Sequence, residues 1–287
     1  MNDIYTLLEK YNFWWKNPTI QTWYERTRYL NILKDTLNIP TLIKVIIGQR
    51  RVGKSYLLRQ VIKLLIQEKK VPPKNILSIN FELDDFSSIK NKDDLKNVIE
   101  LFISKHRPTG IVYLFFDEIQ EVSGWEKIIN SYRAQENFEI FISGSNSKLL
   151  SGELSTYLSG RFIECTIHPF SFEEFLGFHQ LPRNKGSLIE YINFSGIPEI
   201  YNLPTRELQA SFMKSLKNTI ILRDLIQRYS IKDIDLIEKI FLFTANNIGN
   251  LFSLNSIRKK LKQEWVTIST TTLSNYIRYF EEVFIIS

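Results

Sequence analysis

The feature that most constrains this chain is residues 48–55, which read GQRRVGKS and fit the pattern GxxxxGK[ST]. They directly follow an apolar run, residues 42–47, and open a stretch of helical periodicity, residues 54–67. Glycines let a backbone curl so that successive N–H groups point inward, and the positive end of the following helix faces the same point. The pattern therefore predicts a loop that holds phosphate groups. A glycine-rich turn without a ligand is the alternative, and the strand–loop–helix context disfavours it.

Each fixed position of this loop has a chemical task. We expect Lys54 to neutralise the β- and γ-phosphates and the Ser55 hydroxyl to ligate Mg²⁺. Further binding contacts are expected from the rest of the loop and the helix start, namely Gly48, Gln49, Arg50, Arg51, Val52, Gly53 and Tyr56. The predicted ligands are ATP or ADP, with Mg²⁺ as the metal cofactor.

An acidic pair follows a second apolar run. Residues 111–116 end in Asp117 and Glu118, and the carboxyl end of a neighbouring parallel strand faces the same crevice as the loop. Asp117 can then hold Mg²⁺ opposite Ser55, usually through water. Glu118 is placed to accept a proton from an attacking water as general base. The alternative is that the two carboxylates only cap the next helix.

Polar and basic residues elsewhere are candidate catalytic accessories. Ser145 and Asn146 follow the expected strand at residues 138–143, where they could orient water beside the γ-phosphate or cap a helix. Arg161 stands just before the last expected strand and could reach a γ-phosphate from a neighbouring subunit, or simply start the strand at the surface. Residues 91–94, NKDD, fit the guanine-reading pattern NKxD but precede the acidic strand and begin a helix, so adenine is favoured.

Short apolar runs alternate with helical periods through the first half of the chain. The expected strands are residues 42–47, 76–81, 111–116, 138–143 and 162–167, and helices are expected at 54–67, 93–105, 125–134 and 148–158. This alternation is typical of an α/β fold with a parallel sheet covered on both faces. After residue 169 only helices are expected, at residues 170–179, 187–194, 207–228, 234–244, 255–261 and 270–283.

Three regions follow from these patterns. Residues 1–175 form a P-loop domain whose first 40 residues are a helical lead-in; residues 176–230 form a helical connector, and residues 231–287 a last domain. Trp14, Trp15 and Trp23 in the lead-in could form a ligand surface, but packing of this segment onto its own domain is favoured.

Composition excludes several other classes of protein. The longest apolar run is too short to span a bilayer, and no signal peptide is recognisable at the N-terminus. The one cysteine, Cys165, fits a reducing compartment, and no two of the three histidines share a metal-ligand spacing. We therefore expect a cytoplasmic protein without a membrane partner. The net charge of +6 permits nucleic-acid contact, although a general richness in Lys, Ile and Asn would also produce it.

With these motifs assembled, the chain resembles the predicted archaeal and bacterial ATPases of the AAA+ superfamily that carry a C-terminal domain of unknown function. The shared stretches are the Trp14–Trp15 pair, GQRRVGKS, LFFDEIQEVSGWE, FISGSNSKLLSGEL, LSGRF, HPFSFEEFL and SGIPE. The resemblance implies an AAA+-like five-stranded sheet of order 5-1-4-3-2. It also implies that Arg161 is an arginine finger in a homo-oligomer, that Ser145 and Asn146 form the sensor, and that a winged helix begins after Ile231.

The helical pattern near the end of the chain also fits a winged helix. Residues 269–278 resemble a recognition helix and follow the basic residues 258–260, so residues 255–280 could contact DNA. Winged helices also bind proteins, so a protein partner is the alternative to DNA. Members of the family usually continue further, with a domain likened to restriction nucleases, whereas this chain ends at Ser287 where a wing strand should begin. We expect that the last domain is truncated, and the alternative is that the chain is a short member of the family.

Two functions are carried forward from the sequence. The leading hypothesis is ATP hydrolysis by Lys54, Ser55, Asp117 and Glu118, coupled to the C-terminal helices. The rival is a nucleotide-gated DNA- or protein-binding switch with negligible hydrolysis. A nuclease is the weakest interpretation, because the chain lacks a convincing PD…ExK pattern.

Overall fold

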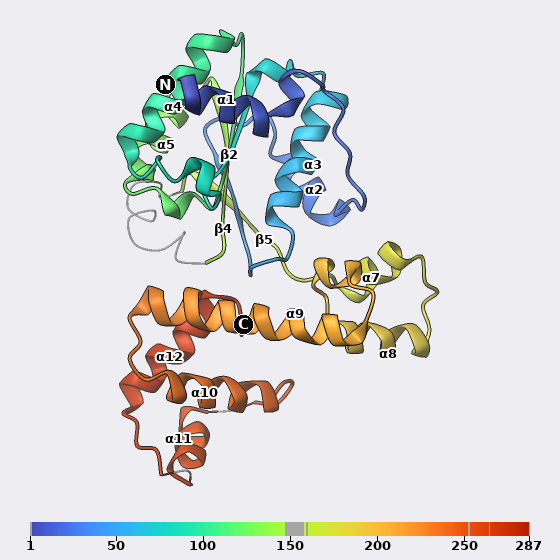
Figure 1. Ribbon diagram of the computed structural model, residues 1–287, viewed down its shortest axis with the longest axis vertical. Coiled ribbons are helices and arrows are strands. Elements are labelled where there is room, and N and C mark those ends of the chain that lie inside the picture. The colour runs from blue at the N-terminus through green and yellow to red at the C-terminus, as the bar shows by residue number, and fades with distance from the viewer. Residues whose placement is uncertain (1, 147–157, 159, 252, 264, 287) are drawn as a thin grey trace. The chain divides into compact units, whose positions relative to one another are not determined.

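A computed structural model describes residues 2–146, 158, 160–251, 253–263 and 265–286 of the 287-residue chain (Figure 1). The chain divides into two compact units, Met1–Pro198 and Glu199–Ser287, which are described separately. The helix expected at residues 148–158 lies outside the described residues except for Leu158.

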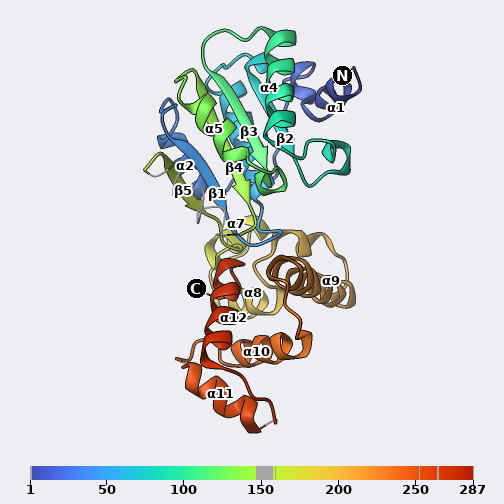
Figure 2. The ribbon, with the colours of Figure 1, turned by 90° about the vertical axis from the view of Figure 1, so that its left-hand side faces the viewer.

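The first unit contains a five-stranded parallel sheet (Figure 2). Its spatial order is β2-β3-β4-β1-β5, which confirms the expected order 5-1-4-3-2. The strands are β1 (Ile43–Ile47), β2 (Ile76–Asn80), β3 (Val112–Asp117), β4 (Phe138–Gly144) and β5 (Phe162–Thr166).

The three central strands β1, β3 and β4 are buried along their whole length. Helices on both faces remove these strands from water, which is why their sequences are mostly apolar, with Lys44 of β1 and Glu139 of β4 as buried exceptions. In Figure 1 one face is covered by α2 (Thr27–Asp35) and α3 (Lys54–Gln67), and the other by α4 (Lys92–His106) and α5 (Trp125–Arg133). The fold therefore brings the carboxyl ends of all five strands to one edge.

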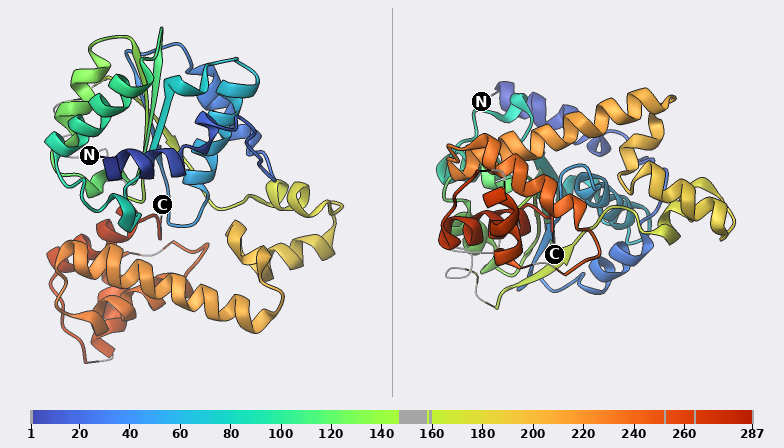
Figure 3. Two further views of the ribbon diagram at one scale, coloured as in Figure 1. Left: turned by 45° about the horizontal axis from the view of Figure 1, so that its top comes forward. Right: turned by 90° about the horizontal axis from the view of Figure 1, so that it is seen from below.

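The N-terminal segment packs onto the face that α4 covers. It consists of α1 (Asn2–Tyr11) and the 3₁₀ turn Phe13–Trp15, and α1 lies against β2 and α4 (Figure 3). Trp14 is buried, and the Trp15 indole N–H donates to the Ile76 carbonyl at 2.7 Å. These two tryptophans serve packing, as expected, whereas Trp23 is 86% exposed.

Short helical elements connect the layers of the first unit. They are the 3₁₀ turns Pro73–Asn75, Asp84–Phe86 and Ile119–Glu121, and, after β5, α7 (Phe172–His179) and α8 (Lys185–Phe194). The 3₁₀ turn Pro198–Asn202 spans the division between the units.

The second unit is helical throughout its described residues. It contains α9 (Arg206–Thr219), the π-helix Ile220–Gln227, α10 (Ile234–Asn246), α11 (Leu254–Gln263) and α12 (Thr270–Glu282). Neither unit has a described helix long and apolar enough to cross a membrane. The domain boundaries at residues 175 and 230 stay predictions.

Candidate phosphate-binding site

The loop between β1 and α3 depends on its two glycines. A Cβ on Gly48 (φ 152°) would lie 2.2 Å from the Ile167 carbonyl oxygen, so only glycine fits where the loop leaves the sheet. Gly53 has φ 100°, a conformation that other residues rarely adopt, and it stands immediately before the first residue of α3. The loop therefore curls at the positive end of a helix, as the sequence predicts.

Lys54 lies inside the loop that precedes it. Its ammonium is buried and donates to the carbonyl oxygens of Gly48 and Gln49 at 3.0 and 3.1 Å. The same nitrogen lies 3.4 Å from the Glu118 carboxylate. One cation thus joins the loop to the end of the acidic strand.

Asp117, the last residue of β3, is held by the ends of the two neighbouring strands. It accepts hydrogen bonds from the Ser143 hydroxyl of β4 and, at 3.1 Å, from the Asn80 amide of β2. Burial and the nearby Glu118 charge raise the pKa of Asp117 above its ordinary value, opposed by hydrogen bonds from Ser143 and Ser55. The contact with Ser55 brings together the two residues expected to hold Mg²⁺.

Glu118 is fixed by both its backbone and its side chain. Its N–H donates to the Ser143 hydroxyl at 3.2 Å. Its carboxylate accepts from the Gln120 amide at 2.5 Å and from the Ser145 backbone N–H at 3.1 Å. Burial alone would raise the pKa of Glu118, but the charge of Lys54 and the Gln120 hydrogen bond bring it below its ordinary value. The group is therefore an ionised carboxylate next to a buried cation.

Ser145 and Asn146 are both buried, and the Ser145 backbone N–H contacts this carboxylate. The Ser145 hydroxyl has no hydrogen-bond partner among the described residues. A buried hydroxyl without a partner is costly, which makes it a candidate contact for a bound water or ligand.

Comparisons with known proteins identify this architecture. Residues 41–176 match the family model described as an AAA domain. This segment of the chain therefore resembles an AAA domain. Residues 185–287 match a second model, described as a domain of unknown function, DUF8612.

Two relatives share most of this chain. An uncharacterized protein of Haemophilus influenzae is 36% identical over 268 residues, covering 91% of this chain and 65% of the relative. The uncharacterized protein MJ1544 of Methanocaldococcus jannaschii is 34% identical over 259 residues, covering 86% of this chain and 56% of the relative. The chain thus spans less than two thirds of the length of these relatives.

Among solved structures, DnaA from Aquifex aeolicus bound to AMPPCP is similar at 17% identity. The match covers 92% of this chain and 90% of that one, with a TM-score of 0.42.

Other predicted site residues of the AAA domain lie around the loop. The Arg50 guanidinium pairs with Glu82 at 2.6 Å, just beyond the end of β2. Arg51 is exposed and has φ 63°, and Val52 is buried. The Tyr56 hydroxyl accepts the backbone N–H groups of residues 23 and 24, so this side chain is engaged with the N-terminal segment.

Arg161 is not brought together with these residues. Its carbonyl accepts from the Ile43 N–H at 2.9 Å, and Phe162 pairs with Ile43 at the amino ends of β5 and β1. The exposed Arg161 therefore lies at the edge of the sheet opposite to the loop.

The guanine-reading pattern of residues 91–94 is a helix cap. The Asn91 side chain accepts from the backbone N–H groups of Asp93 and Asp94, and the Asp94 carboxylate accepts from the Asn91 N–H. This reciprocal capping box accounts for the polar residues without any base contact.

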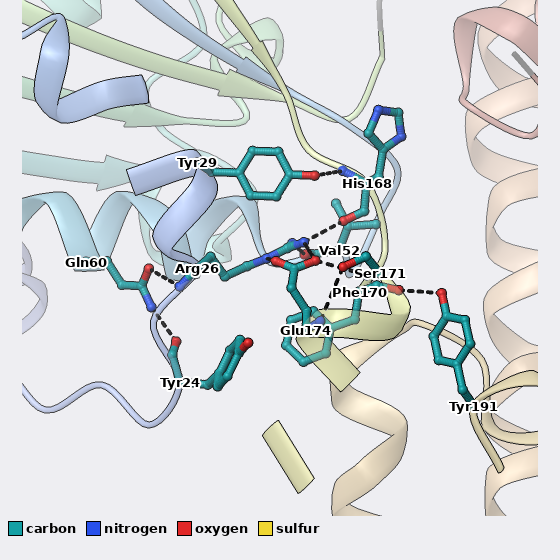
Figure 4. A network of polar contacts seen from close by, with 10 residues as sticks. All are labelled: Tyr24, Arg26, Tyr29, Val52, Gln60, His168, Phe170, Ser171, Glu174 and Tyr191. Atoms are coloured by element: carbon teal, nitrogen blue, oxygen red, sulfur yellow. Dashed lines mark hydrogen bonds and ion pairs between the residues drawn. The ribbon is translucent and has the colours of Figure 1, made fainter. Parts of the chain in front are cut away.

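Four residues at the site were missed by the sequence analysis. Asn80 and Gln120 bind the two acidic side chains, while the buried Arg26 forms an ion pair with Glu174 and contacts the loop (Figure 4). Asn80 could have been found as the polar end of the strand beside Asp117. Arg26 gave no signal, because it lies in a polar, irregular stretch between two aromatic residues.

The donors at the sheet edge suit magnesium. The Ser55 hydroxyl and the Asp117 carboxylate are hard oxygen ligands in mutual contact. Among described residues no cluster of three or more His, Cys, Asp and Glu could hold a metal ion. Magnesium needs only one or two protein oxygens when substrate phosphates supply further ligands, so this small set fits it.

Proposed function

We propose that this chain binds Mg·ATP at residues 48–55 and hydrolyses it. The observation that carries the proposal is the position of the Lys54 ammonium, which contacts the loop carbonyls on one side and the Glu118 carboxylate on the other. A γ-phosphate held by Lys54 would therefore lie next to the carboxylate that can activate water.

Binding uses groups that the loop already presents. The Lys54 ammonium exchanges its carbonyl partners for phosphate oxygens. The backbone N–H groups of residues 48–55 donate hydrogen bonds to the remaining phosphate oxygens. Ser55 and Asp117 would hold Mg²⁺. When bound, the metal neutralises negative charge on the β- and γ-phosphates.

Hydrolysis requires an ionised base and an oriented water. The lowered pKa of Glu118 keeps its carboxylate ready to accept a proton. Ser145 and Asn146 are proposed to orient the attacking water, because the Ser145 hydroxyl is buried beside Glu118 and lacks a described partner.

The variant Glu118→Gln tests this proposal directly. It keeps the size of the side chain but cannot accept the proton, so ATP turnover should fall by about 10²–10⁴-fold while binding is retained. The control is Glu121→Gln, which changes an exposed glutamate three residues later and should leave turnover unchanged. Unchanged phosphate release by Glu118→Gln would contradict the role of general base.

An arginine supplied by a neighbouring copy would complete the site. Because Arg161 lies at the opposite edge of its own sheet, it can act only on the nucleotide of another copy. Arg161→Ala should bind ATP normally, turn it over slowly and regain turnover when mixed with Lys54→Ala protein. A chain that remains a monomer in solution with ATP would exclude this role.

A nucleotide-gated DNA switch is the second candidate, favoured by the surface of α11. Arg258, Lys259 and Lys262 are exposed on this helix, while Ile257 and Leu261 are buried beneath it. We propose that α11 and α12 form the helical part of a winged helix that contacts DNA phosphates. Salt-dependent DNA binding retained by Lys54→Ala, together with unmeasurable ATP turnover in the wild type, would favour the switch over the ATPase.

A further inference from the structure

The Arg26 side chain is enclosed against the phosphate-binding loop, with 1% of it exposed. Its Nε and Nη2 donate to the two carboxylate oxygens of Glu174 at 2.8 and 2.9 Å. Nη1 donates to the Val52 carbonyl at 2.8 Å, and Nη2 also donates to the His168 carbonyl at 3.0 Å (Figure 4). This guanidinium thus links the loop to the segment that enters α7.

The bond to Val52 fixes more than one carbonyl. Val52 and Gly53 share a planar trans peptide, in which the C=O and the N–H point in opposite directions. Holding the Val52 oxygen toward Arg26 therefore turns the Gly53 N–H away from Arg26. Because glycine tolerates many backbone angles, this peptide could rotate easily without such a bond.

The segment that carries Arg26 is itself fixed to the helix after the loop. The Arg26 backbone N–H donates to the Gln60 side-chain oxygen of α3 at 3.2 Å, and the Gln60 amide donates to the Tyr24 carbonyl. The Tyr24 N–H in turn donates to the Tyr56 hydroxyl of α3 at 3.0 Å. The guanidinium is therefore held in position relative to the start of α3.

We propose that Arg26 is a positioning residue for phosphate binding: through the Val52 carbonyl it orients the Gly53 N–H toward the phosphates, and Glu174 holds the guanidinium in place. The inference rests on the proposed function, since it assigns a role at the same nucleotide site. It also joins the first turn of α7, where Glu174 lies, to the phosphate-binding loop.

Arg26→Lys is the decisive variant. Lysine keeps the positive charge but cannot reproduce the planar fork that reaches Val52, His168 and Glu174 together. Affinity for a non-hydrolysable Mg·ATP analogue, measured by calorimetry at a temperature where the variant is folded, should weaken on the order of tenfold or more. Glu174→Gln, which keeps Arg26 but removes its counter-charge, should weaken affinity by roughly threefold.

A matched control separates positioning from general stability. Glu139→Gln alters another buried, ion-paired glutamate in the same unit, near the amino end of β4, and should lower the thermal midpoint without changing affinity. If Arg26→Lys lowers the midpoint but binds the analogue as tightly as the wild type, the inference is overturned. If Arg26→Lys does not fold, wild-type affinity in Glu174→Gln overturns it. Failure of the wild type to bind the analogue at all would refute the proposed function itself.

Discussion

Two buried lysine–glutamate pairs lie at opposite ends of the same sheet. Lys44 of β1 and Glu139 of β4 approach to 2.5 Å with both side chains fully buried. Lys54 and Glu118, beyond the carboxyl ends of β1 and β3, are 3.4 Å apart and are 5% and 8% exposed. The residue types and degree of burial are nearly the same in the two pairs.

The partners of each pair make the difference. Lys44 also donates to the Ile39 carbonyl, and Glu139 also accepts from the Asn38 N–H, so protein groups satisfy both charges. Among the residues that the structure describes, Lys54 donates only to loop carbonyls besides its contact with Glu118, and phosphate oxygens can replace such partners. Burial of an ion pair therefore does not identify a site; replaceable partners at the carboxyl edge do.

The largest effect that would test this contrast is on nucleotide affinity. Lys54→Met should weaken binding of a non-hydrolysable Mg·ATP analogue by about a hundredfold or more, because each lost charge-assisted hydrogen bond costs about 1.5–3 kcal/mol. The control is the double variant Lys44→Met/Glu139→Leu, which removes the other pair and should bind normally in the same calorimetric titration. Equal losses of affinity in both proteins would show that the two ion pairs do not differ in their importance for nucleotide binding.

The next effect is on the free energy of unfolding. Glu139→Leu alone leaves the Lys44 charge buried without its counter-ion and should destabilise the fold by about 3–5 kcal/mol. The double variant Lys44→Met/Glu139→Leu should recover most of that loss, since replacing both partners removes the unpaired charge. Denaturant unfolding of the wild type, Glu139→Leu and the double variant measures these free energies. A double variant no more stable than Glu139→Leu would show that the loss comes from the missing ion pair and not from the unpaired Lys44 charge.

Arg26 and Glu174 form a third ion pair in the same unit. The contribution of this pair to the free energy of unfolding should depend on pH. Burial opposes ionisation of Glu174, but hydrogen bonds from Arg26 and Ser171 bring the pKa of Glu174 below its ordinary value of 4.5. The folded state then binds fewer protons than the unfolded chain, so this contribution is present above pH 4.5 and is lost as the pH falls through the lower folded pKa.

Glu174→Gln should remove that dependence. The wild type should lose stability more steeply than the variant as the pH falls below 4.5, as measured by urea unfolding at several pH values. A parallel fall of the two curves would mean that Glu174 titrates alike in the folded and unfolded chains.

Sequence patterns predicted the sheet well because a parallel sheet imposes strong constraints. Continuous short apolar runs such as residues 112–116 are typical of strands covered on both faces. Lys54 and Ser55 were predictable from the fixed spacing of the loop pattern, and Asp117 and Glu118 from their place at the end of an apolar run.

Arg26 and Glu174 were not predictable, because 148 residues separate them and folding alone brings them together. For Arg161 the family resemblance implied a role, but its position could not be read from the sequence. Only the register of β5 with β1 places Arg161 at the far edge of its own sheet.

The smallest predicted effect concerns Asn91, whose side chain caps the first turn of α4. Asn91→Ala removes the side-chain acceptor for the Asp93 and Asp94 N–H groups and should lower the free energy of unfolding by about 1 kcal/mol. Asn184→Ala, at the corresponding cap of α8, should produce a loss of similar size. Both variants should keep the wild-type preference for ATP over GTP. A change in base preference in Asn91→Ala alone would show that the NKDD stretch reads the nucleotide after all, because loss of a helix cap cannot alter selectivity between bases.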